Sequence, residues 1–280
     1  MEKVRSPFKI QGNKFELLEQ IEAARVRLNK KHGVWVEPFM GSATVGLNMA
    51  KGPAYFYDTN PHTVKFFNGL ISGKLSTERI ERKLVRCHNG MLKEGGDFYY
   101  KLRERFNRSH CPIDFFALNH LSHSGLIRFN LSGGFNTPHG KSKVLPHSLI
   151  ASLMKRCEYV RDAGKSYQWT FKRLDFRKAI PLHADNENAL LFLDPPYIER
   201  SPTYFNSWTM EEEKALFKSL DEASASFLLT TWIQNGDGTH KNPSIAPLWS
   251  KYPYISRMHR YFVRGQSKNV TIEEAVFYKR

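Results

Sequence analysis

Hydrophobic and polar residues change their spacing along the chain, and these changes predict an alternating series of strands and helices. Short apolar runs rich in β-branched and aromatic residues predict strands at 34–37, 54–57, 167–171, 190–193 and 226–231. Apolar residues at helical spacing predict helices at about 15–24, 43–49 and 209–223. Two further strands, at 255–263 and 271–278, are expected to close the sheet as a hairpin. The pattern indicates an α/β fold.

The segment from residue 61 to 155 differs, because helical spacing replaces the alternation of strands and helices. It predicts helices near 61–72, 76–90, 94–107 and 112–123, and a helix near 146–162 leads back to the sheet. Lys and Arg are dense here, and most are expected on solvated helical faces. We therefore divide the chain into a core, 1–60 and 156–280, and a helical insert, 61–155.

A hairpin is predicted within the insert, at residues 124–141. Two short runs flank Ser132-Gly133-Gly134, and such a turn between extended runs is typical of a hairpin. A two-stranded ribbon can enter the major groove of DNA, where Arg pairs with guanine and Asn with adenine, while Lys contacts phosphates. The candidate DNA-binding residues are Arg128, Asn130, Asn136, Pro138 and Lys141.

The most distinctive stretch is the apolar run Leu190–Leu193, which is followed by Asp194-Pro195-Pro196-Tyr197. Two consecutive prolines lack N–H groups, so the chain must leave the sheet here. Open α/β sheets bind their ligands at such carboxyl ends of strands. The carboxylate and a free proline carbonyl can accept both hydrogens of an exocyclic amine, and the tyrosine ring can stack on its heterocycle. The alternative is an ordinary strand-terminating turn with a capping Asp194.

Three earlier segments carry residues suited to a small cofactor. Lys14 follows a tight loop with Gly12 and can reach a ligand carboxylate. Phe39 and Gly41 lie in a strand–loop–helix segment, where a glycine permits close approach and a ring can lie against an adenine. Asp58 ends the next strand, where such folds bind ribose hydroxyls. The simpler alternatives are a solvated Lys14 and an N-cap role for Asp58.

Two later segments are also candidates. Asp175 can accept the amino group of an adenine and Phe176 can flank its ring, although a helix N-cap and a core phenylalanine are the simpler alternative. The loop from Ser201 to Trp208 contains Tyr204 and Phe205, and it is either a lid near a target base or a packed edge of the domain. A dinucleotide-binding G-x-G-x-x-G motif is absent from the sequence.

Composition and charge narrow the class of partner. The 280 residues include 42 Lys and Arg against 27 Asp and Glu, a formal net charge of +15, which favours a polyanion such as nucleic acid. The three cysteines, Cys87, Cys111 and Cys157, form no C-x-x-C pair and indicate reduced thiols in a cytosolic compartment. We find no apolar run long enough to span a membrane and expect a cytoplasmic protein. No His/Cys cluster suggests a metal.

The motifs, taken together, resemble those of the Dam-type DNA adenine methyltransferases (D12 class, alpha arrangement). The matching residues are Lys9, Gly12, Lys14, Glu37-Pro38-Phe39-x-Gly41, Asp58, Asn60, Arg128-Phe129-Asn130, Gly134, Phe135, Asn136, Pro138, Gly140 and Asp194-Pro195-Pro196-Tyr197. Their order, with cofactor motifs first, then the recognition insert and then the catalytic turn, marks the alpha arrangement. The chain departs from the family at Ile10, usually Trp, and at His123-Ser124, where the family has an aromatic residue and Asn.

The resemblance implies a Rossmann-like methyltransferase sheet and transfer of a methyl group from S-adenosylmethionine to N6 of a flipped-out adenine in a specific double-stranded DNA sequence. The implied catalytic residues are Asp194, Pro195, Pro196 and Tyr197. The implied cofactor-binding residues are Ile10, Lys14, Glu37, Phe39, Gly41, Asp58, Asp175, Phe176 and Asp194. A metal is not implied, and a cognate restriction endonuclease is a possible functional partner. A methyltransferase for an RNA or protein amine, and a catalytically silent DNA-binding module, are the alternatives.

Overall fold

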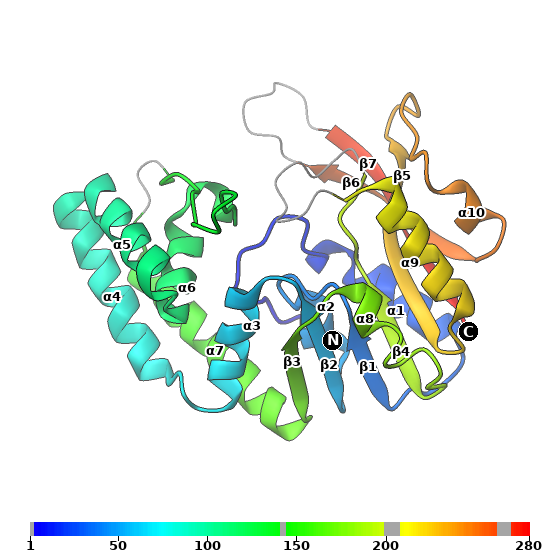
Figure 1. The fold of residues 1–280 in the computed structure, drawn as a ribbon, viewed down its shortest axis with the longest axis horizontal. Helices are drawn as coiled ribbons and strands as arrows, with labels where there is room; N and C mark the ends of the chain where they lie inside the picture. Colours follow the sequence, from blue (N-terminus) through cyan, green and yellow to red (C-terminus); the bar gives the residue numbers. More distant parts are fainter. Residues whose placement is uncertain (1–2, 141–143, 199–207, 262–269) are drawn as a thin grey trace.

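The described strands form one sheet of seven in the order β3-β2-β1-β4-β5-β7-β6 (Figure 1). This computed structural model describes residues 3–140, 144–198, 208–261 and 270–280. The strands are β1 Val34–Glu37, β2 Ala54–Asp58, β3 Trp169–Arg173, β4 Ala189–Leu193, β5 Ser226–Asn235, β6 Tyr254–Tyr261 and β7 Val270–Lys279. β1 to β5 run parallel, whereas β7 runs antiparallel to both β5 and β6. The predicted α/β fold with a closing hairpin is confirmed.

The central strand β4 pairs with β1 on one side and β5 on the other. All five residues of β4 are buried, since helices cover both faces of the sheet and leave no solvated side. Neighbouring residues therefore pack into different cores. Leu190 and Phe192 belong to one apolar cluster, and Leu191 and Leu193 belong to the other. This alternation fixes the register of the strand that leads into the proposed catalytic turn.

Helices cover the two faces of the sheet unequally. The first cluster contains buried residues of α1 Leu18–Arg27, α2 Thr44–Met49, α3 Pro61–Ile71 and α7 His147–Ser166. The second contains residues of α8 Phe176–Ala179, α9 Met210–Glu222 and α10 Ala246–Trp249. A short 3-10 turn, η1 Phe15–Leu17, precedes α1. The first cluster continues without a break into the insert, which explains how the insert is held against the sheet.

The insert forms a helical lobe beside the β3 edge of the sheet (Figure 1). Its helices are α4 Thr77–Glu94, α5 Gly96–Ser109 and α6 Pro112–Leu121, followed by the 3-10 turn η2 His123–Gly125. Two of its basic residues, Lys83 and the exposed Arg105, pair with a buried acid. Lys83 Nζ and Arg105 Nε lie 2.5 and 2.7 Å from the buried carboxylate of Asp114. These ion pairs join all three helices around one buried charge.

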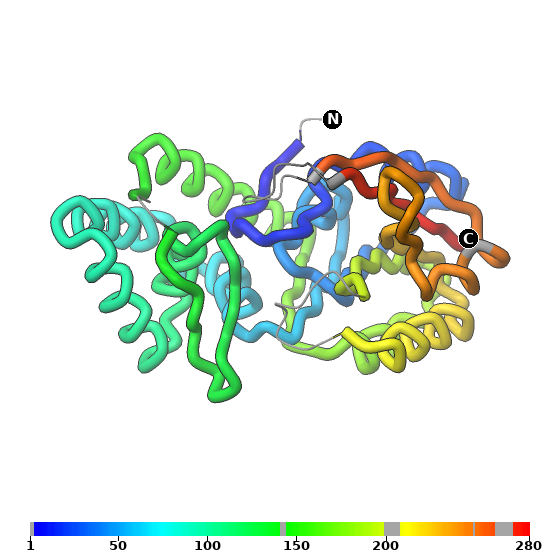
Figure 2. Tube along the Cα trace, turned by 90° about the horizontal axis from the view of Figure 1, so that it is seen from above, coloured from blue at the N-terminus to red at the C-terminus, as the bar shows by residue number. Residues whose placement is uncertain are grey.

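The predicted hairpin doubles back as expected, but it pairs only at isolated positions rather than along two continuous strands. Phe129 faces Phe135, and Ser122 faces His139. The turn closes through bonds between Asn130 and both Gly133 and Gly134, with Gly133 at a φ of +79° that favours glycine. Figure 2 shows this segment, in green, projecting beyond the neighbouring helices.

Two of the three cysteine side chains are buried. Cys87, Cys111 and Cys157 are all free thiols. Burial raises the pKa of Cys87 to about 11 and that of Cys157 to about 12, so both behave as packing residues rather than nucleophiles. Within the described ranges, every helix falls short of the length and apolar character that crossing a bilayer requires.

Candidate active site

The proposed catalytic turn begins directly after β4, at the carboxyl edge of the parallel strands, as the sequence predicts. Asp194 Oδ1 lies 2.9 Å from Lys14 Nζ and accepts a hydrogen bond from the Thr230 hydroxyl at 2.7 Å. The carboxylate keeps 20% of its side chain exposed. Burial raises the pKa of Asp194, while the Lys14 ammonium and the Thr230 bond oppose that shift. One oxygen is thus held by the protein, and the other carries the remaining acceptor capacity.

Lys14 is not the solvated lysine of the simpler alternative. Only 5% of its side chain is exposed, and its Nζ donates to the Gly12 carbonyl at 2.8 Å. Gly12 has a φ of +75°, which lets the loop turn back toward the lysine. The ammonium also lies 4.8 Å from the centre of the Tyr197 ring. Lys14 therefore connects the N-terminal loop to the turn after β4.

Glu274 on β7 completes this group and is not among the site residues predicted from the sequence. The Tyr197 hydroxyl donates to Glu274 Oε1 at 3.0 Å, and the same oxygen lies 3.9 Å from Lys14 Nζ. Glu274 is 1% exposed. Its signal in the sequence is a charged residue that directly precedes the apolar run Ala275–Phe277, since an unpaired carboxylate is almost never fully buried.

Glu37 ends β1 and is fully buried. Its Oε2 accepts hydrogen bonds from Trp35 Nε1 at 3.1 Å and from the Gly46 N–H at 3.0 Å. Burial raises the pKa of Glu37 to about 8. A Cβ at position 46 would lie 2.5 Å from this oxygen, so only glycine fits there. Glu37 therefore connects β1 to α2 below the loop of residues 38–43.

Asp58 connects the loop between β1 and α2, residues 38–43, to the end of β2. Its Oδ2 accepts from the Gly41 N–H and its Oδ1 from the Asn60 N–H, both at 2.8 Å. Gly41 and Ala43 have φ values of +50° and +57°, and the left-handed Ala43 stores about 1 kcal/mol of strain. The side chain that caps α3 belongs to Asn60, which accepts from His62, so the N-cap alternative for Asp58 is wrong.

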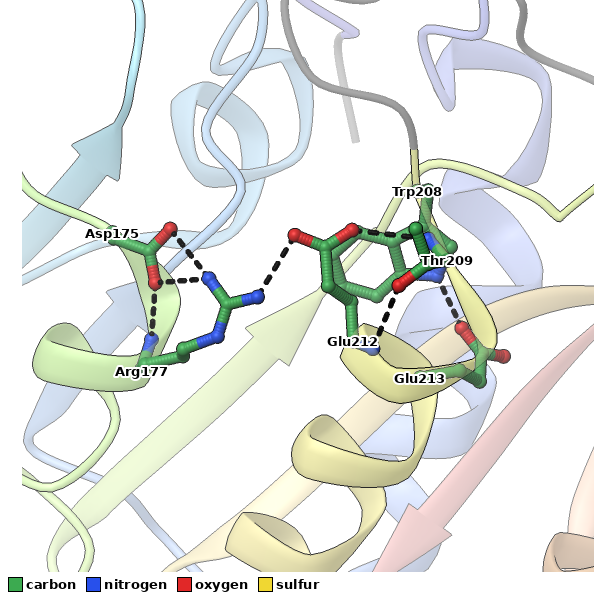
Figure 3. Close-up of polar contacts among 6 residues, drawn as sticks. All are labelled: Asp175, Arg177, Trp208, Thr209, Glu212 and Glu213. Carbon is green, nitrogen blue, oxygen red and sulfur yellow. Dashed lines mark hydrogen bonds and ion pairs between the residues drawn. The ribbon is translucent and has the colours of Figure 1, made fainter.

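Three aromatic rings meet beside these loops. Phe39 and Phe176 have ring centres 5.2 Å apart, and Trp208 lies 5.5 Å from Phe39 and 5.3 Å from Phe176. Trp208 Nε1 donates to the buried carboxylate of Glu213, as Figure 3 shows. Trp208 thus packs on Phe39 and Phe176, the two rings predicted to contact the cofactor. Tyr204 and Phe205, from the loop interpreted as either a lid or a packed edge of the domain, lie outside the described residues.

Asp175 caps a helix, which is the simpler alternative considered for it. Its Oδ1 accepts from the Arg177 N–H at 2.9 Å at the start of α8. The Arg177 guanidinium also bonds Asp175 and reaches Glu212 at 2.8 Å on α9 (Figure 3). Thr209 and Glu212 form a capping box at the start of α9. This bridge joins the first turns of the two helices around the aromatic rings.

The hairpin presents the predicted DNA-binding residues on a pinned backbone. Arg128 and Asn130 are exposed, and Pro138 is exposed as well. Arg128 Nε donates to Asn136 Oδ1 at 2.8 Å, whereas Asn130 Oδ1 accepts from the Gly134 N–H at 2.7 Å and holds its own turn. Lys141 lies outside the described residues.

Two asparagine side chains, the half-buried Asn107 and the buried Asn119, position the backbone on either side of the proposed recognition segment. Asn107 bonds both the N–H and the carbonyl of Phe135, at 2.9 and 3.2 Å. Asn119 bonds the N–H and carbonyl of Lys9, at 2.9 and 2.8 Å, and donates to the Gly125 carbonyl at 3.0 Å. Asn119 therefore links the N-terminal loop, which contains the half-buried Ile10, to the base of the hairpin. Neither residue was selected from the sequence.

Comparisons with known proteins identify the family to which the chain is similar. A model of the D12 class N6 adenine-specific DNA methyltransferase family matches residues 11–261. The chain is 26% identical over 252 residues to a DNA adenine methylase of Vibrio cholerae, covering 86% of this chain and 84% of the relative. It is 29% identical over 229 residues to that of Escherichia coli, covering 77% and 75%. Similarity of 26% over 232 residues extends to Modification methylase StsI of Streptococcus sanguinis, covering 78% of this chain and 33% of the relative.

Proposed function

The chain belongs to the D12 class of N6 adenine-specific DNA methyltransferases, and from this premise we propose that it transfers a methyl group from S-adenosylmethionine to N6 of an adenine in a specific double-stranded DNA sequence. The observation that carries the proposal is the arrangement of Asp194. Its Oδ1 is held by Lys14 and Thr230, and its exposed side is left for an incoming amine.

The proposed mechanism depends on positioning. The Asp194 carboxylate and the Pro195 carbonyl accept the two hydrogens of the target amine, with Pro196 stiffening the turn, and Tyr197 stacks on the adenine ring. Bound S-adenosylmethionine supplies an electrophilic methyl group. Holding the amine in line with it can account for about 7–11 kcal/mol of the barrier. The negative charge of Asp194 offsets positive charge that develops on nitrogen. Unstacking the adenine costs a few kcal/mol, which stacking in the pocket offsets.

The residues around the loops that follow β1 and β2 fit the chemistry of the cofactor. The rings of Phe39 and Phe176 are suited to its adenine, and Trp208 adds a third ring. The Asp58 oxygens each keep a lone pair for ribose hydroxyls while bonding the loop backbone. Asp175 is suited to the adenine amino group. In this proposal Ile10, Lys14, Glu37 and Gly41 shape the rest of the pocket, and Asp194 borders it.

We assign residues 61–155 to target recognition. The exposed Arg128 and Asn130 are suited to base edges, with Asn136, Pro138 and Lys141 beside them. The excess of 42 Lys and Arg over 27 Asp and Glu favours a polyanionic substrate. The similarity to a protein named Modification methylase supports a place in a restriction-modification system. In that case a cognate endonuclease is the functional partner and the bacterial cytoplasm the site of action.

The test uses purified protein, methyl-labelled S-adenosylmethionine and unmethylated genomic DNA, with Asp194→Ala as the matched control. The DNA is digested to nucleosides and the label is located. We expect label in N6-methyladenine with the wild type and none with the variant. Label in RNA or protein but not in DNA would establish a different amine acceptor. Binding of DNA without binding of the cofactor would establish a silent DNA-binding module.

A further inference from the structure

We propose that Glu274 is a positioning residue for methyl transfer that acts through Lys14 and Tyr197; this inference rests on the function proposed above. Glu274 lies on β7, far along the chain from the catalytic turn, and its side chain is buried. Its Oε1 accepts the Tyr197 hydroxyl at 3.0 Å and lies 3.9 Å from Lys14 Nζ. One carboxylate oxygen thus contacts both residues that border Asp194.

The strand geometry aims Glu274 at the site and its neighbour Glu273 elsewhere. Successive residues of a strand point to opposite faces. Glu273 accepts bonds from Gln234 at 2.9 Å and from Ser256 at 2.7 Å, away from the catalytic turn. The pairing of β5 with β7 shifts register between Trp232 and Gln234, directly opposite these two acids. Such bulges bend a strand and re-aim its side chains, and they are frequent beside active sites.

The charges explain what Glu274 does. Lys14 lies 2.9 Å from Asp194 and 3.9 Å from Glu274, so one ammonium is shared by two carboxylates. If Lys14 paired with Asp194 alone, the two charges would cancel. No net negative charge would then remain beside the target amine. The second carboxylate leaves the group with a net negative charge, which stabilises positive charge developing on the amine nitrogen. The bond to the Tyr197 hydroxyl also fixes the ring on which the adenine stacks.

The test compares Glu274→Gln with Glu273→Gln, which changes the adjacent acid on the same strand. Single-turnover methyl transfer to DNA, cofactor affinity and DNA affinity are measured for each. We expect Glu274→Gln to lower the transfer rate by about 10- to 100-fold, because a displaced reaction geometry has effects of that size. Both affinities should stay within about threefold of wild type, and Glu273→Gln should stay within about twofold in rate. A wild-type transfer rate in Glu274→Gln would overturn the inference.

A second readout separates this inference from the proposed function. Thermal unfolding midpoints are measured for Glu274→Ala, which removes the acceptor, for Tyr197→Phe, which removes the donor, and for the double variant. Because both single changes break the same hydrogen bond, we expect the double variant to unfold no lower than the less stable single variant. Additive decreases would contradict the contact and overturn the inference. If the wild type makes no N6-methyladenine, the proposed function fails, and this cycle alone decides whether Glu274 holds Tyr197.

Discussion

The proposed catalytic turn and the proposed recognition hairpin are both polar loops, yet they are built in opposite ways. In the turn, the side chains are held: Asp194 is bonded by Lys14 and Thr230, and Tyr197 by Glu274. In the hairpin, it is chiefly the backbone that is held. Asn107 bonds the backbone of Phe135 while the Arg128 side chain stays exposed.

The difference fits the role proposed for each loop. A reacting group needs one geometry in a site of low dielectric, where a fixed charge is most effective. A group that reads base edges must keep its donors and acceptors available until DNA arrives. The Arg128 guanidinium is only oriented, by Asn136 Oδ1 at 2.8 Å and the Asn136 carbonyl at 3.2 Å. The hairpin is therefore a fixed backbone that presents adaptable side chains.

We expect the largest effect from Asp194→Ala, which removes the carboxylate held in the proposed catalytic turn. Methyl transfer should fall by about a thousandfold or more, because the amine loses both its acceptor and its compensating charge. DNA affinity should stay within about twofold, since the hairpin is untouched. Transfer is measured by label in N6-methyladenine and affinity by titration of a fluorescent duplex. A variant that still transfers methyl groups at the wild-type rate would remove Asp194 from the mechanism.

Arg128→Ala, which removes an exposed side chain of the hairpin, should change which DNA sequences are methylated. A bidentate contact to a base is worth about 1–3 kcal/mol, so the rate on the preferred sequence should fall by about 5- to 150-fold. Affinity for unrelated DNA should fall less, because phosphate contacts remain. Sequencing the methylated sites should reveal relaxed preference at one position. Equal losses on all sequences would instead assign Arg128 to phosphate binding.

Asn119→Ala should show where the two loops meet, and Asn107→Ala is its matched control. Asn119 bonds Lys9 in the N-terminal loop and Gly125 at the base of the hairpin. Its loss removes the partner of the buried Gly125 carbonyl, which costs about 1–3 kcal/mol, and releases the backbone of Lys9. We expect weaker binding of both cofactor and DNA, by about 5- to 10-fold, whereas Asn107→Ala should weaken DNA binding alone. Calorimetry with each ligand makes the measurement, and identical profiles for the two variants would contradict the coupling.

Local patterns in the sequence were enough to predict the sheet, the insert helices and the positions of the candidate residues. Strands such as Leu190–Leu193 are buried on both faces, so their apolar runs stand out. Prolines 195 and 196 mark the turn because they lack N–H groups. The family resemblance likewise follows from short motifs, each of which is confined to one loop.

Contacts between distant segments could not be predicted from those local patterns. Glu274 reaches Tyr197 only because β7 inserts between β5 and β6. The ion pair of Lys14 could not be predicted either, because Lys14 and Asp194 are far apart in the sequence and only the fold brings them together. The hairpin pairs less than its sequence suggested, because side chains of the insert helices take over the bonds that a strand partner would otherwise make.

Glu37→Gln should change the pH dependence of stability in the core, whereas a substitution in the hairpin should not. Burial raises the pKa of Glu37 to about 8 from 4.5, so between these values the folded protein holds a proton that the unfolded chain releases. The contribution of Glu37 to stability must therefore fall as pH rises through this window, by up to about 1.4 kcal/mol per pH unit. Urea unfolding from pH 5 to 8 should show the variant gaining stability relative to wild type. Asn136→Ala in the hairpin carries no titrating group and should track wild type, and parallel curves for Glu37→Gln would place the proton elsewhere.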